Sequence, residues 1–502
     1  MSHKHTVLLS VALLTLLYVA AIPLSAQAQR PRESVQMTDR ILRMMEDVPD
    51  GGPTGEQVGW NWNWYLGPLL DNCRKTPTEE WMLPTEKILN TMFDKMTAGY
   101  DGYKGFVGPY IYNDEYWCDV HVSDAILCSH ALKFAMIVHD QPELQTKYDV
   151  SCKRFIAIVQ KDLIEKWHAR GTFIDDGPFG GYRDGTMYCK PGDLENWVEK
   201  DTARTDNKAP SLPFNKALDM AYCMLQLYYL TGENSYKTQA TQIYNRVKAG
   251  MNRFDGAYTW NYWEPVSPRD IIETAPRRYD LTHWVGTHPY RDYQLGEIEK
   301  IIFAYDMGVT FTEDDMRRLV ATNLKFMWNG DLDDPQWANS DSKLPGYVKA
   351  APSTAYPTTA GTVWAPLARF DETIGKLAKQ TQPVDWARKY APDAMVEDFP
   401  WMRGIGESGG QTEAIVIPSV VPAEENTMIL SKSYQTERSP VEIYVRPLDG
   451  DKLTLLTTQQ MGNSVQMFYS WDGKIDGQRT PDEYVIIWKF LNGERAFPVT
   501  LK

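Results

Sequence analysis

The sequence predicts a mainly α protein, in which helical hairpins form an α/α toroid (an incomplete barrel) followed by a small C-terminal antiparallel β-sandwich. Three observations support this fold class. Apolar residues recur at helical spacing up to about residue 410 and alternate beyond it. The helical segments come in pairs with short internal turns. The 502 residues also exceed one core of ordinary size, so two domains are expected.

The N-terminus has the pattern of an export signal. Lys4 precedes an apolar run from Val7 to Ile22, and Ala26-Gln27-Ala28 suits signal peptidase. We therefore expect residues 1–28 to be a signal peptide and the mature protein to be periplasmic or secreted. No later stretch approaches the roughly 18 apolar residues that a membrane span requires, so no membrane partner is expected.

The predicted toroid occupies residues 29–405 and contains three clear helical hairpins. They span residues 123–167, 214–250 and 292–328. Short turns join the two helices of each pair, at Gln141-Pro142 in the first and at "TGEN" in the second. In the third hairpin, Thr312 and Asp315 have the spacing of a capping box, which marks the start of its second helix.

Long connections separate the hairpins and are rich in glycine, proline and aromatic residues. They cover residues 99–119, 169–212, 253–291 and 330–360. Every second connection in an array of antiparallel hairpins lies at the same end, so these loops should share one rim and wall a cleft. Because no strict short repeat is present, an open solenoid is disfavoured. Helix N-termini at this rim favour bound anions, even in a chain of net charge −14.

Residues 411–502 are predicted to form the β-sandwich. Segments such as "VEIYVRPL" and "YVIIWKF" alternate apolar and polar residues, and turns such as "LDGD" and "LNGE" separate them. The six cysteines are too few for a disulfide framework. Cys128 and Cys223 lie on apolar faces of predicted helices and are expected to be buried free thiols, while one or two bridges elsewhere stay open.

Three predicted loops combine flat aromatic side chains with amides, in "GWNWNWYLGP", "GPYIYNDEYW" and "TWNYWEP". Aromatic faces stack on the apolar side of pyranose rings, and amides bind their hydroxyls. The alternative is that these rings belong to the core, because large aromatics carry much of any core's burial. We expect a glycan-binding surface formed by Trp60, Trp62, Trp64, Tyr112, Trp260, Asn261, Trp263 and His283.

Residues 277–294 concentrate three arginines, three tyrosines and two histidines at the start of a predicted inner helix. This set suits β-elimination from a uronic acid. Removal of the C5 proton places negative charge beside a carboxylate, so an Asn, His or Arg must neutralise that carboxylate. A tyrosine or histidine then takes the proton, and a tyrosine donates one to the leaving oxygen at C4. Asn215, at the head of the preceding hairpin, is expected to reach the same cleft.

These features together resemble the secreted α/α-toroid polysaccharide lyases that act on uronic-acid glycans, the alginate and glucuronan lyases such as polysaccharide lyase family 38. The resemblance covers about residues 60–380 and rests on the asparagine of "FNKALDMA", the "WNYWEP" loop, the His/Tyr/Arg segment and "FAYDMGVTFTEDDMRRL". It implies that Asn215 and His288 neutralise the carboxylate. It also implies that Tyr290 or Tyr293 is base and acid, assisted by Arg278 or Arg291. Asn261 departs from the pattern, which would have a histidine there.

Three other functions stay open. An inverting glycoside hydrolase on the same fold needs two carboxylates about 6.5–9.5 Å apart. Asp175, Asp176, Asp184 and Glu264 lie in suitable loops, although the first three also suit Gly-rich turns. A uronyl C5-epimerase would share the carboxylate neutralisation and reprotonate the opposite face. A non-catalytic glycan-binding protein would need only the aromatic loops.

The sequence lacks the motifs of other common reaction classes. The sequence has no phosphate-binding or dinucleotide glycine loop, no CxxC pair and no GxSxG elbow, and its acidic balance disfavours nucleic acid. We expect no cofactor, no catalytic metal and a monomer whose partner is an acidic polysaccharide. A structural calcium ion stays open at Asn329–Asp341, which offers oxygen ligands but lacks the closing glutamate. Asp119, His121 and Asp124 are expected to cap a helix.

Overall fold

The computed structural model describes most of the chain, which divides into two compact units. The described residues are 38–48, 54–110, 113–199, 211–283, 293–337, 340, 361–380, 413–432, 439–461, 466–490 and 493–502. The first unit is Met1–Leu163 with Met187–Trp197, and the second is Ile164–Thr186 with Val198–Lys502. The signal peptide predicted at residues 1–28 lies outside the described residues. The domain bounds 29–405 and 411–502 stay predictions.

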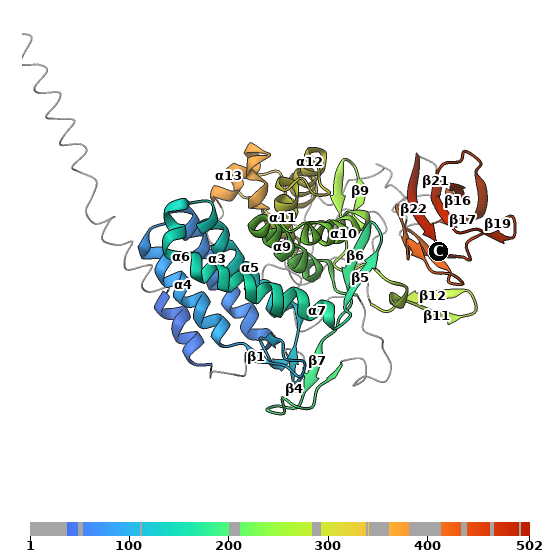
Figure 1. Cartoon of the computed structure of the whole chain (residues 1–502). Helices are drawn as coiled ribbons and strands as arrows, with labels where there is room; N and C mark the ends of the chain where they lie inside the picture. Colours follow the sequence, from blue (N-terminus) through green and yellow to red (C-terminus); the bar gives the residue numbers. More distant parts are fainter. Residues whose placement is uncertain are drawn as a thin grey trace, which may run out of the picture. The chain divides into compact units, whose positions relative to one another are not determined.

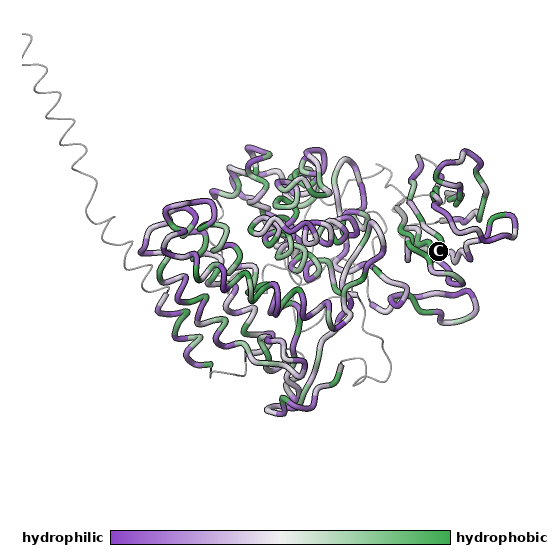
Figure 2. Tube along the Cα trace, viewed as in Figure 1, coloured by the Kyte–Doolittle hydropathy of each residue, from purple (hydrophilic) through white to green (hydrophobic). Residues whose placement is uncertain are grey.

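The predicted fold class is confirmed. A mainly helical region made of antiparallel helix pairs precedes a C-terminal region of antiparallel sheets (Figure 1). In Figure 2, apolar and polar stretches alternate along the helices, as expected for elements that bury one face.

The first unit contains the packed helices α3 (Gly55–Lys75), α4 (Glu79–Asp94), α5 (His121–His139) and α6 (Pro142–Val159). A short helix over residues 38–46 precedes them in the chain. The α5–α6 hairpin confirms the first predicted pair, and Pro142 begins α6 where its missing N–H costs nothing. Helix α5 is the one described helix that is long and apolar enough to cross a membrane. Because 83% of its apolar window is buried inside the protein, it has the character of a core helix.

Short strands fill the predicted loop 99–119 and the segment after residue 186. They are β1 (Thr97–Ala98), β2 (Lys104–Gly105), β3 (Gly108–Tyr110), β4 (Asn113–Asp119) and β7 (Met187–Cys189). Strand β4 pairs with both β3 and β7, all antiparallel. Where long aromatic loops were expected, the chain therefore forms small β-ribbons.

The second unit contains the other two predicted hairpins. Helix α9 (Phe214–Thr231) pairs with α10 (Asn234–Gly250), and α11 (Tyr293–Asp306) precedes α12 (Glu313–Ala321). Gly232 ends α9 in the left-handed conformation that glycine adopts most easily. The capping box predicted from Thr312 and Asp315 is confirmed, with both of its hydrogen bonds present.

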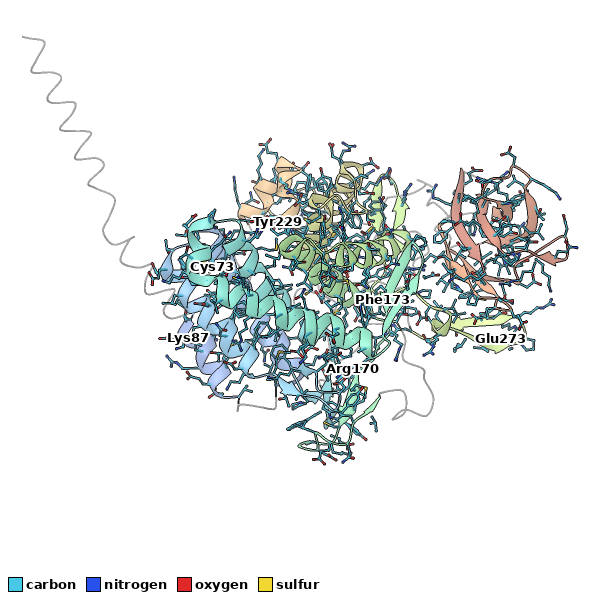
Figure 3. The ribbon with its side chains drawn as sticks, viewed as in Figure 1. Cys73, Lys87, Arg170, Phe173, Tyr229 and Glu273 are labelled. Atoms are coloured by element: carbon cyan, nitrogen blue, oxygen red, sulfur yellow. The ribbon has the colours of Figure 1, made fainter. Side chains whose placement is uncertain are left out.

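Shorter elements complete the helical part of this unit. Three hairpins occupy the long connections: β5 (Phe173–Asp176) with β6 (Phe179–Tyr182), β9 (Asn252–Phe254) with β10 (Ala257–Thr259), and β11 (Ile271–Ala275) with β12 (Arg278–Leu281). The remaining helical segments of this unit are α7 (Lys166–Ala169), the 3-10 helix Pro268–Asp270, the π-helix Thr322–Met327, the 3-10 helix Ala365–Arg369 and α13 (Glu372–Gln380). Along the chain, the π-helix Gln160–Glu165 connects α6 to α7. Phe173, labelled in Figure 3, packs on His168 and Tyr182.

The C-terminal region forms the expected β-sandwich. One sheet has the order β13-β15-β18 and the other β14-β22-β21-β16-β17. The strands are β13 (Glu413–Ile417), β14 (Val420–Val421), β15 (Thr427–Lys432), β16 (Ser439–Pro447), β17 (Thr454–Met461), β18 (Gln466–Trp471), β21 (Asp482–Phe490) and β22 (Gly493–Leu501), with a small hairpin of β19 (Lys474–Ile475) and β20 (Gln478–Arg479).

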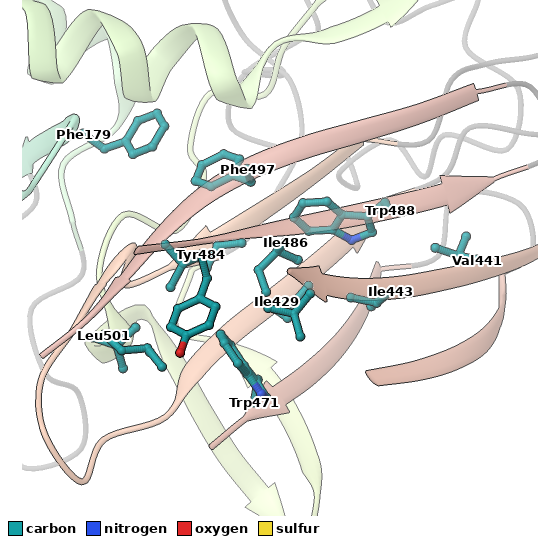
Figure 4. Packing of buried hydrophobic residues seen from close by; sticks show 14 of the residues in the cluster. Phe179, Ile429, Val441, Ile443, Trp471, Tyr484, Ile486, Trp488, Phe497 and Leu501 are labelled. Atoms are coloured by element: carbon teal, nitrogen blue, oxygen red, sulfur yellow. The ribbon is translucent and has the colours of Figure 1, made fainter. Parts of the chain in front are cut away.

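The core of this sandwich comes from the inward residues of both sheets. Ile429, Ile443, Ile486 and Trp488 are buried in it, as Figure 4 shows. Phe179 of the β5–β6 hairpin joins the same cluster and stacks on Phe497 with ring centroids 4.8 Å apart. The hairpin therefore packs directly on the sandwich.

All six cysteines are buried free thiols. The prediction for Cys128 and Cys223 is therefore confirmed, and burial raises the pKa of Cys73 and Cys189 to about 11. Such thiols stay protonated and unreactive at neutral pH.

Candidate functional site

Four separated segments of the second unit meet around the loop that follows β10. The backbone N–H of Phe214, at the head of α9, donates to the carbonyl of Tyr262 at 3.0 Å. Gln294, at the head of α11, donates through Nε2 to the carbonyl of Trp260 at 3.0 Å. His283, after β12, lies with its ring centroid 5.3 Å from that of Trp263. We call the group formed by Asn215, Trp260, Asn261, Trp263, Glu264, His283 and Glu297 the loop-260 cluster.

Asn215 is the polar side chain of this cluster at the head of α9. It is 5% exposed, and its Oδ1 accepts no hydrogen bond from any residue that the structure describes. Pro213 occupies the N-cap position without a side-chain cap. Leaving a buried polar atom without a partner costs about 1–3 kcal/mol, so such an atom calls for an explanation. A ligand group at the head of the helix supplies one.

Two buried glutamates are held by neighbouring residues of the loop. Asn261 donates through Nδ2 to Glu264 Oε1 at 2.5 Å, and Trp260 donates through its indole N–H to Glu297. Both carboxyl groups are at most 1% exposed. Adjacent residues of one loop therefore hold two buried carboxyl groups, Glu264 of the loop itself and Glu297 of α11.

Sequence analysis missed Glu297. It lies four residues after Tyr293, on the same face of α11, within an otherwise apolar pattern that includes Ile298 and Ile301. Acidic residues are uncommon on the buried face of a helix, so this position of Glu297 could have identified it in the sequence as a candidate site residue.

The tryptophans of the loop are interior residues. Trp260 and Trp263 are 1% and 0% exposed, and the indole N–H of Trp263 donates to the carbonyl of Ser211 at 2.8 Å. Their position agrees with the alternative that these rings belong to the core. They hold the loop in place through their N–H groups rather than present an open stacking face.

The stretch "GWNWNWYLGP" was predicted to be a loop, and this is wrong because it lies inside helix α3. Two residues along a helix turn about 200°, so Trp62 faces away from Trp60. Trp62 is 1% exposed and meets Phe106 edge to face, while Trp60 is half-buried. The Trp–Asn alternation has the two-residue period of a strand, but the segment forms a helix because α3 packs against α5. Trp64 also lies in α3.

The carboxylates of the hydrolase alternative have different positions. Asp175 is exposed and accepts from Gln242 at 2.8 Å, while Asp184 accepts from Thr186 in a turn. Asp176 is buried and pairs with Arg246 at 2.6 Å. Of these predicted carboxylates, Glu264 belongs to the loop-260 cluster.

The residues of the His/Tyr/Arg segment are only partly described. Tyr293 is the first residue of α11, and Arg278 is exposed on β12. Arg277 adopts a positive φ of 61° at the turn between β11 and β12, where Glu273, labelled in Figure 3, accepts its backbone N–H. His288, Tyr290, Arg291 and Tyr112 lie outside the described residues.

The acidic segments considered for calcium form ordinary turns where they are described. Asn329 Oδ1 accepts the N–H groups of Asp331 and Gln336, both at 3.2 Å. Among the described residues, no group of three or more His, Cys, Asp or Glu side chains is arranged to hold a metal ion. In the first unit, Asp124 accepts the N–H of Phe106 at 3.2 Å, and α5 has no side-chain cap. The N-cap residue of α5 is Val120, and the capping role of Asp119, His121 and Asp124 stays a prediction.

No protein-family model matches this chain, and no curated protein sequence matches it. Among solved structures, it is similar to a GH76 α-mannanase from Bacteroides thetaiotaomicron, at 12% identity and a TM-score of 0.33 over 53% of this chain. The match spans 56% of the mannanase, little more than half its length. An unsaturated glucuronyl hydrolase from Bacillus sp. GL1, responsible for the degradation of glycosaminoglycan, matches at 14% identity and a TM-score of 0.34 over 72% of this chain and 80% of its own. A third structure, a glycoside hydrolase, matches at 12% identity and a TM-score of 0.30 over 85% of this chain and 68% of its own. None of the three is named a lyase.

Proposed function

We propose that this protein is a carbohydrate-active enzyme that cleaves a uronic-acid-containing polysaccharide at the loop-260 cluster. The observation that supports this site is the buried Asn215 amide, whose Oδ1 has no partner among the described residues. It lies in the first turn of α9, where free backbone N–H groups and the helix dipole favour a bound anion. A uronate residue at this point suits both groups, because its carboxylate accepts from the Asn215 Nδ2 and from the helix N–H groups while a sugar hydroxyl donates to Oδ1.

The reaction that best uses such an anchor is β-elimination. Asn215 and His288 neutralise the uronate carboxyl group, so the C5 proton becomes removable by Tyr290 or Tyr293. The electrons left at C5 form the C4–C5 double bond, the C4–O bond breaks, and a proton from the tyrosine completes the leaving hydroxyl. Arg278 or Arg291 lowers the pKa of the tyrosine that acts as base. A C5-epimerase would share the first step and differ in the face that is reprotonated.

An inverting glycoside hydrolase is the second candidate, and the buried glutamate pair is the observation that favours it. Glu264 and Glu297 are held by adjacent residues of one loop. In that mechanism, one protonated carboxyl group donates to the glycosidic oxygen while the other, as carboxylate, activates water. The same cluster of side chains therefore supports two chemistries that leave different products.

We also propose that the enzyme acts outside the cytoplasm, because residues 1–28 have the pattern of an export signal. Its partner is then a soluble acidic polysaccharide. A non-catalytic glycan-binding protein would leave such a polymer uncut.

The test is incubation with a panel of acidic polysaccharides, following both ultraviolet absorbance from a new C4–C5 double bond and the release of reducing ends. Absorbance with reducing ends identifies a lyase, and reducing ends alone identify a hydrolase. Failure to cut any uronic-acid polymer in the panel would refute the proposal.

Variants locate the site within the same assay. Asn215→Ala should lower turnover by about 100-fold or more, the scale of losing one donor to a developing anion. Asn234→Ala is the matched control, because Asn234 is an exposed asparagine at the start of α10. In a lyase Glu264→Gln should keep most turnover, whereas in a hydrolase it should abolish turnover. If the Asn215→Ala variant and the control have equal turnover, the loop-260 cluster is not the catalytic site.

A further inference from the structure

The hairpin of β11 and β12 is an exposed sheet of two strands (Figure 1). None of the residues of these two strands is buried, and the Ile272 side chain is 44% exposed. A two-stranded hairpin without a hydrophobic core is at best marginally stable by itself. Because burial within the hairpin cannot hold it, its ends must be fixed by contacts with the rest of the unit.

Asp270 fixes the base of this hairpin. It lies directly before β11, is 0% exposed, and its carboxylate accepts the backbone N–H and the hydroxyl of Ser211 at 2.8 and 2.6 Å. The same carboxylate accepts the N–H of Val266 at 2.8 Å. Directly after β12, Thr282 donates its N–H to the Asp270 carbonyl at 2.9 Å. Because the Trp263 indole also donates to Ser211, both ends of the hairpin are tied to the scaffold of the loop-260 cluster.

Three exposed arginines lie along residues 269–281, which we call the basic arm: Arg269 at its base, and Arg277 and Arg278 at its turn. Their side chains make no hydrogen bond or ion pair with any residue that the structure describes. Backbone groups engage the two acidic side chains of the strands. Glu273 accepts the N–H of Arg277 at 2.8 Å, and Asp280 accepts that of the residue after it, also at 2.8 Å. The arm is therefore locally basic in a chain whose net charge is −14, and its guanidinium groups are available to an anion.

The turn of the basic arm holds Arg277 in a strained backbone conformation. Its φ is 61°, a left-handed value that is uncommon in residues other than glycine. Pro276 precedes it, as in turns whose next position favours glycine. The chain therefore carries a cation at the tip of the arm although glycine would be more stable there. Strain of this kind is common at ligand-binding positions.

We propose that the basic arm binds the polyanionic chain of the substrate outside the loop-260 cluster, with carboxylates of different uronic-acid residues on Arg269 and Arg277. Guanidinium groups bind carboxylates through charge-assisted hydrogen bonds. The two arginines are separated by β11, whose five residues extend about 17 Å, which is longer than one sugar ring. The arm therefore fits a polymer and not a single sugar. The inference rests on the proposed function for the identity of that polymer, a uronic-acid glycan.

The test is binding of glucuronan, a polymer of glucuronic acid, to the full-length chain, measured by biolayer interferometry in the Asn215→Ala variant to slow turnover. Adding Arg269→Gln and Arg277→Gln together should raise the Kd about 5-fold or more, the scale of losing two exposed ion pairs. Arg277→Gly should also raise the Kd, although it relieves the positive φ, whereas Arg277→Lys should keep most of the affinity. Arg317→Gln is the matched control, since Arg317 is 63% exposed on α12 and pairs with Glu313. It should leave the Kd unchanged.

Substrate length separates the basic arm from the catalytic site. With Asn215 intact, the double arginine variant should raise KM for the polymer about 5-fold and leave kcat unchanged, with a thermal midpoint equal to that of the control. Turnover of a glucuronic-acid trisaccharide should not change, because the arm contacts only the part of a long chain that extends beyond the cluster. Arg278 is kept in every variant, since it is a candidate for the proposed reaction. An equal loss of turnover on the trisaccharide would place the two arginines in the catalytic site and overturn the inference.

The outcomes also separate this inference from the proposed function. If the polymer is cut but the double variant changes neither Kd nor KM, the arm is not a binding surface and the proposed function stands. If no polymer is cut yet glucuronan binds in an arginine-dependent way, the arm stands and the catalytic proposal fails. Absence of glucuronan binding overturns the inference. A dimer in light scattering that the double variant dissociates would assign the arm to a second copy of this chain and overturn it as well.

Discussion

Replacing Asp176 with asparagine should destabilise the protein more than any other single change of charge considered for this chain. The carboxylate of Asp176 is 4% exposed and pairs with Arg246, itself 1% exposed, at 2.6 Å. It also accepts the backbone N–H groups of Ser419 and Val420, at 2.7 and 2.9 Å. One carboxylate therefore compensates a buried cation and joins the β5–β6 hairpin to the start of the sandwich.

The size of the effect follows from what Arg246 would lose. Its Nε and Nη1 atoms have no hydrogen-bond partner among the described residues, and burial lowers the pKa of Arg246. Removing one member of a buried ion pair costs about 3–5 kcal/mol, because the other charge stays buried without compensation. The asparagine oxygen can still accept the N–H groups of Ser419 and Val420. We therefore expect the free energy of unfolding to fall by about 3–5 kcal/mol and not by more.

The measurement is urea unfolding of the full chain, with the midpoint and slope compared between variants. Asp175→Asn is the matched control, because the carboxylate of Asp175 is next in the chain and exposed. This substitution should change the free energy of unfolding by no more than about 0.5 kcal/mol. Limited proteolysis should cut the Asp176→Asn variant first near residues 413–421, where the lost hydrogen bonds lie. A loss below about 1 kcal/mol in Asp176→Asn would mean that another carboxylate compensates Arg246, and Asp270 would be the next residue to replace.

Three further predictions concern acid stability, backbone space and the proton-transfer residue. Although burial tends to raise it, the pKa of Asp315 is lowered by hydrogen bonds from Lys248, Tyr258 and Thr312. Asp315 therefore stabilises the fold fully above the unfolded-state pKa of about 3.9, and this contribution is lost as the pH falls through the lower pKa of the folded state. The difference in thermal midpoint between the wild type and Asp315→Asn should consequently close below about pH 4. Gly250→Ala should lower the free energy of unfolding by about 1–3 kcal/mol, because a Cβ there would lie 2.7 Å from the Phe214 ring. Gly296→Ala, which has open space on α11, should raise it by up to about 1 kcal/mol. Equal thermal midpoints of the two variants would contradict this. Replacing the proton-transferring tyrosine, Tyr290 or Tyr293, with Phe should abolish turnover and spare binding, and activity should rise on the alkaline side of neutrality; full turnover in both variants would place the base elsewhere.

Local physics explains what could be predicted from the sequence. The three helical hairpins, the Thr312–Asp315 capping box and the C-terminal strands depend on side-chain period and on contacts within a few residues. Burial of Cys128 and Cys223 follows from the same periodicity, because apolar faces of paired helices pack inward. The role of Asn215, at the head of α9, as a site residue stays a prediction, although its burial there agrees with it.

Local pattern was misleading where two elements compete for the same residues. The alternation in "GWNWNWYLGP" is typical of an exposed loop or strand, yet the stretch forms α3 because α5 packs along it. The long connections were predicted as loops, and short strands such as β9 and β10 pair within them. Strand pairing of this kind depends on partners that no single segment reveals.

Side-chain period and contacts between near neighbours in the chain are enough to define the helix pairs, the switch to strands and the types of residue available for chemistry. The tertiary structure decided which of those residues are buried and which meet. Glu297 joins Trp260 across 37 residues, and Asp176 joins Ser419 across 243 residues. These contacts are long-range, and their energies depend on removal from water, which is a property of the packed chain and not of any segment.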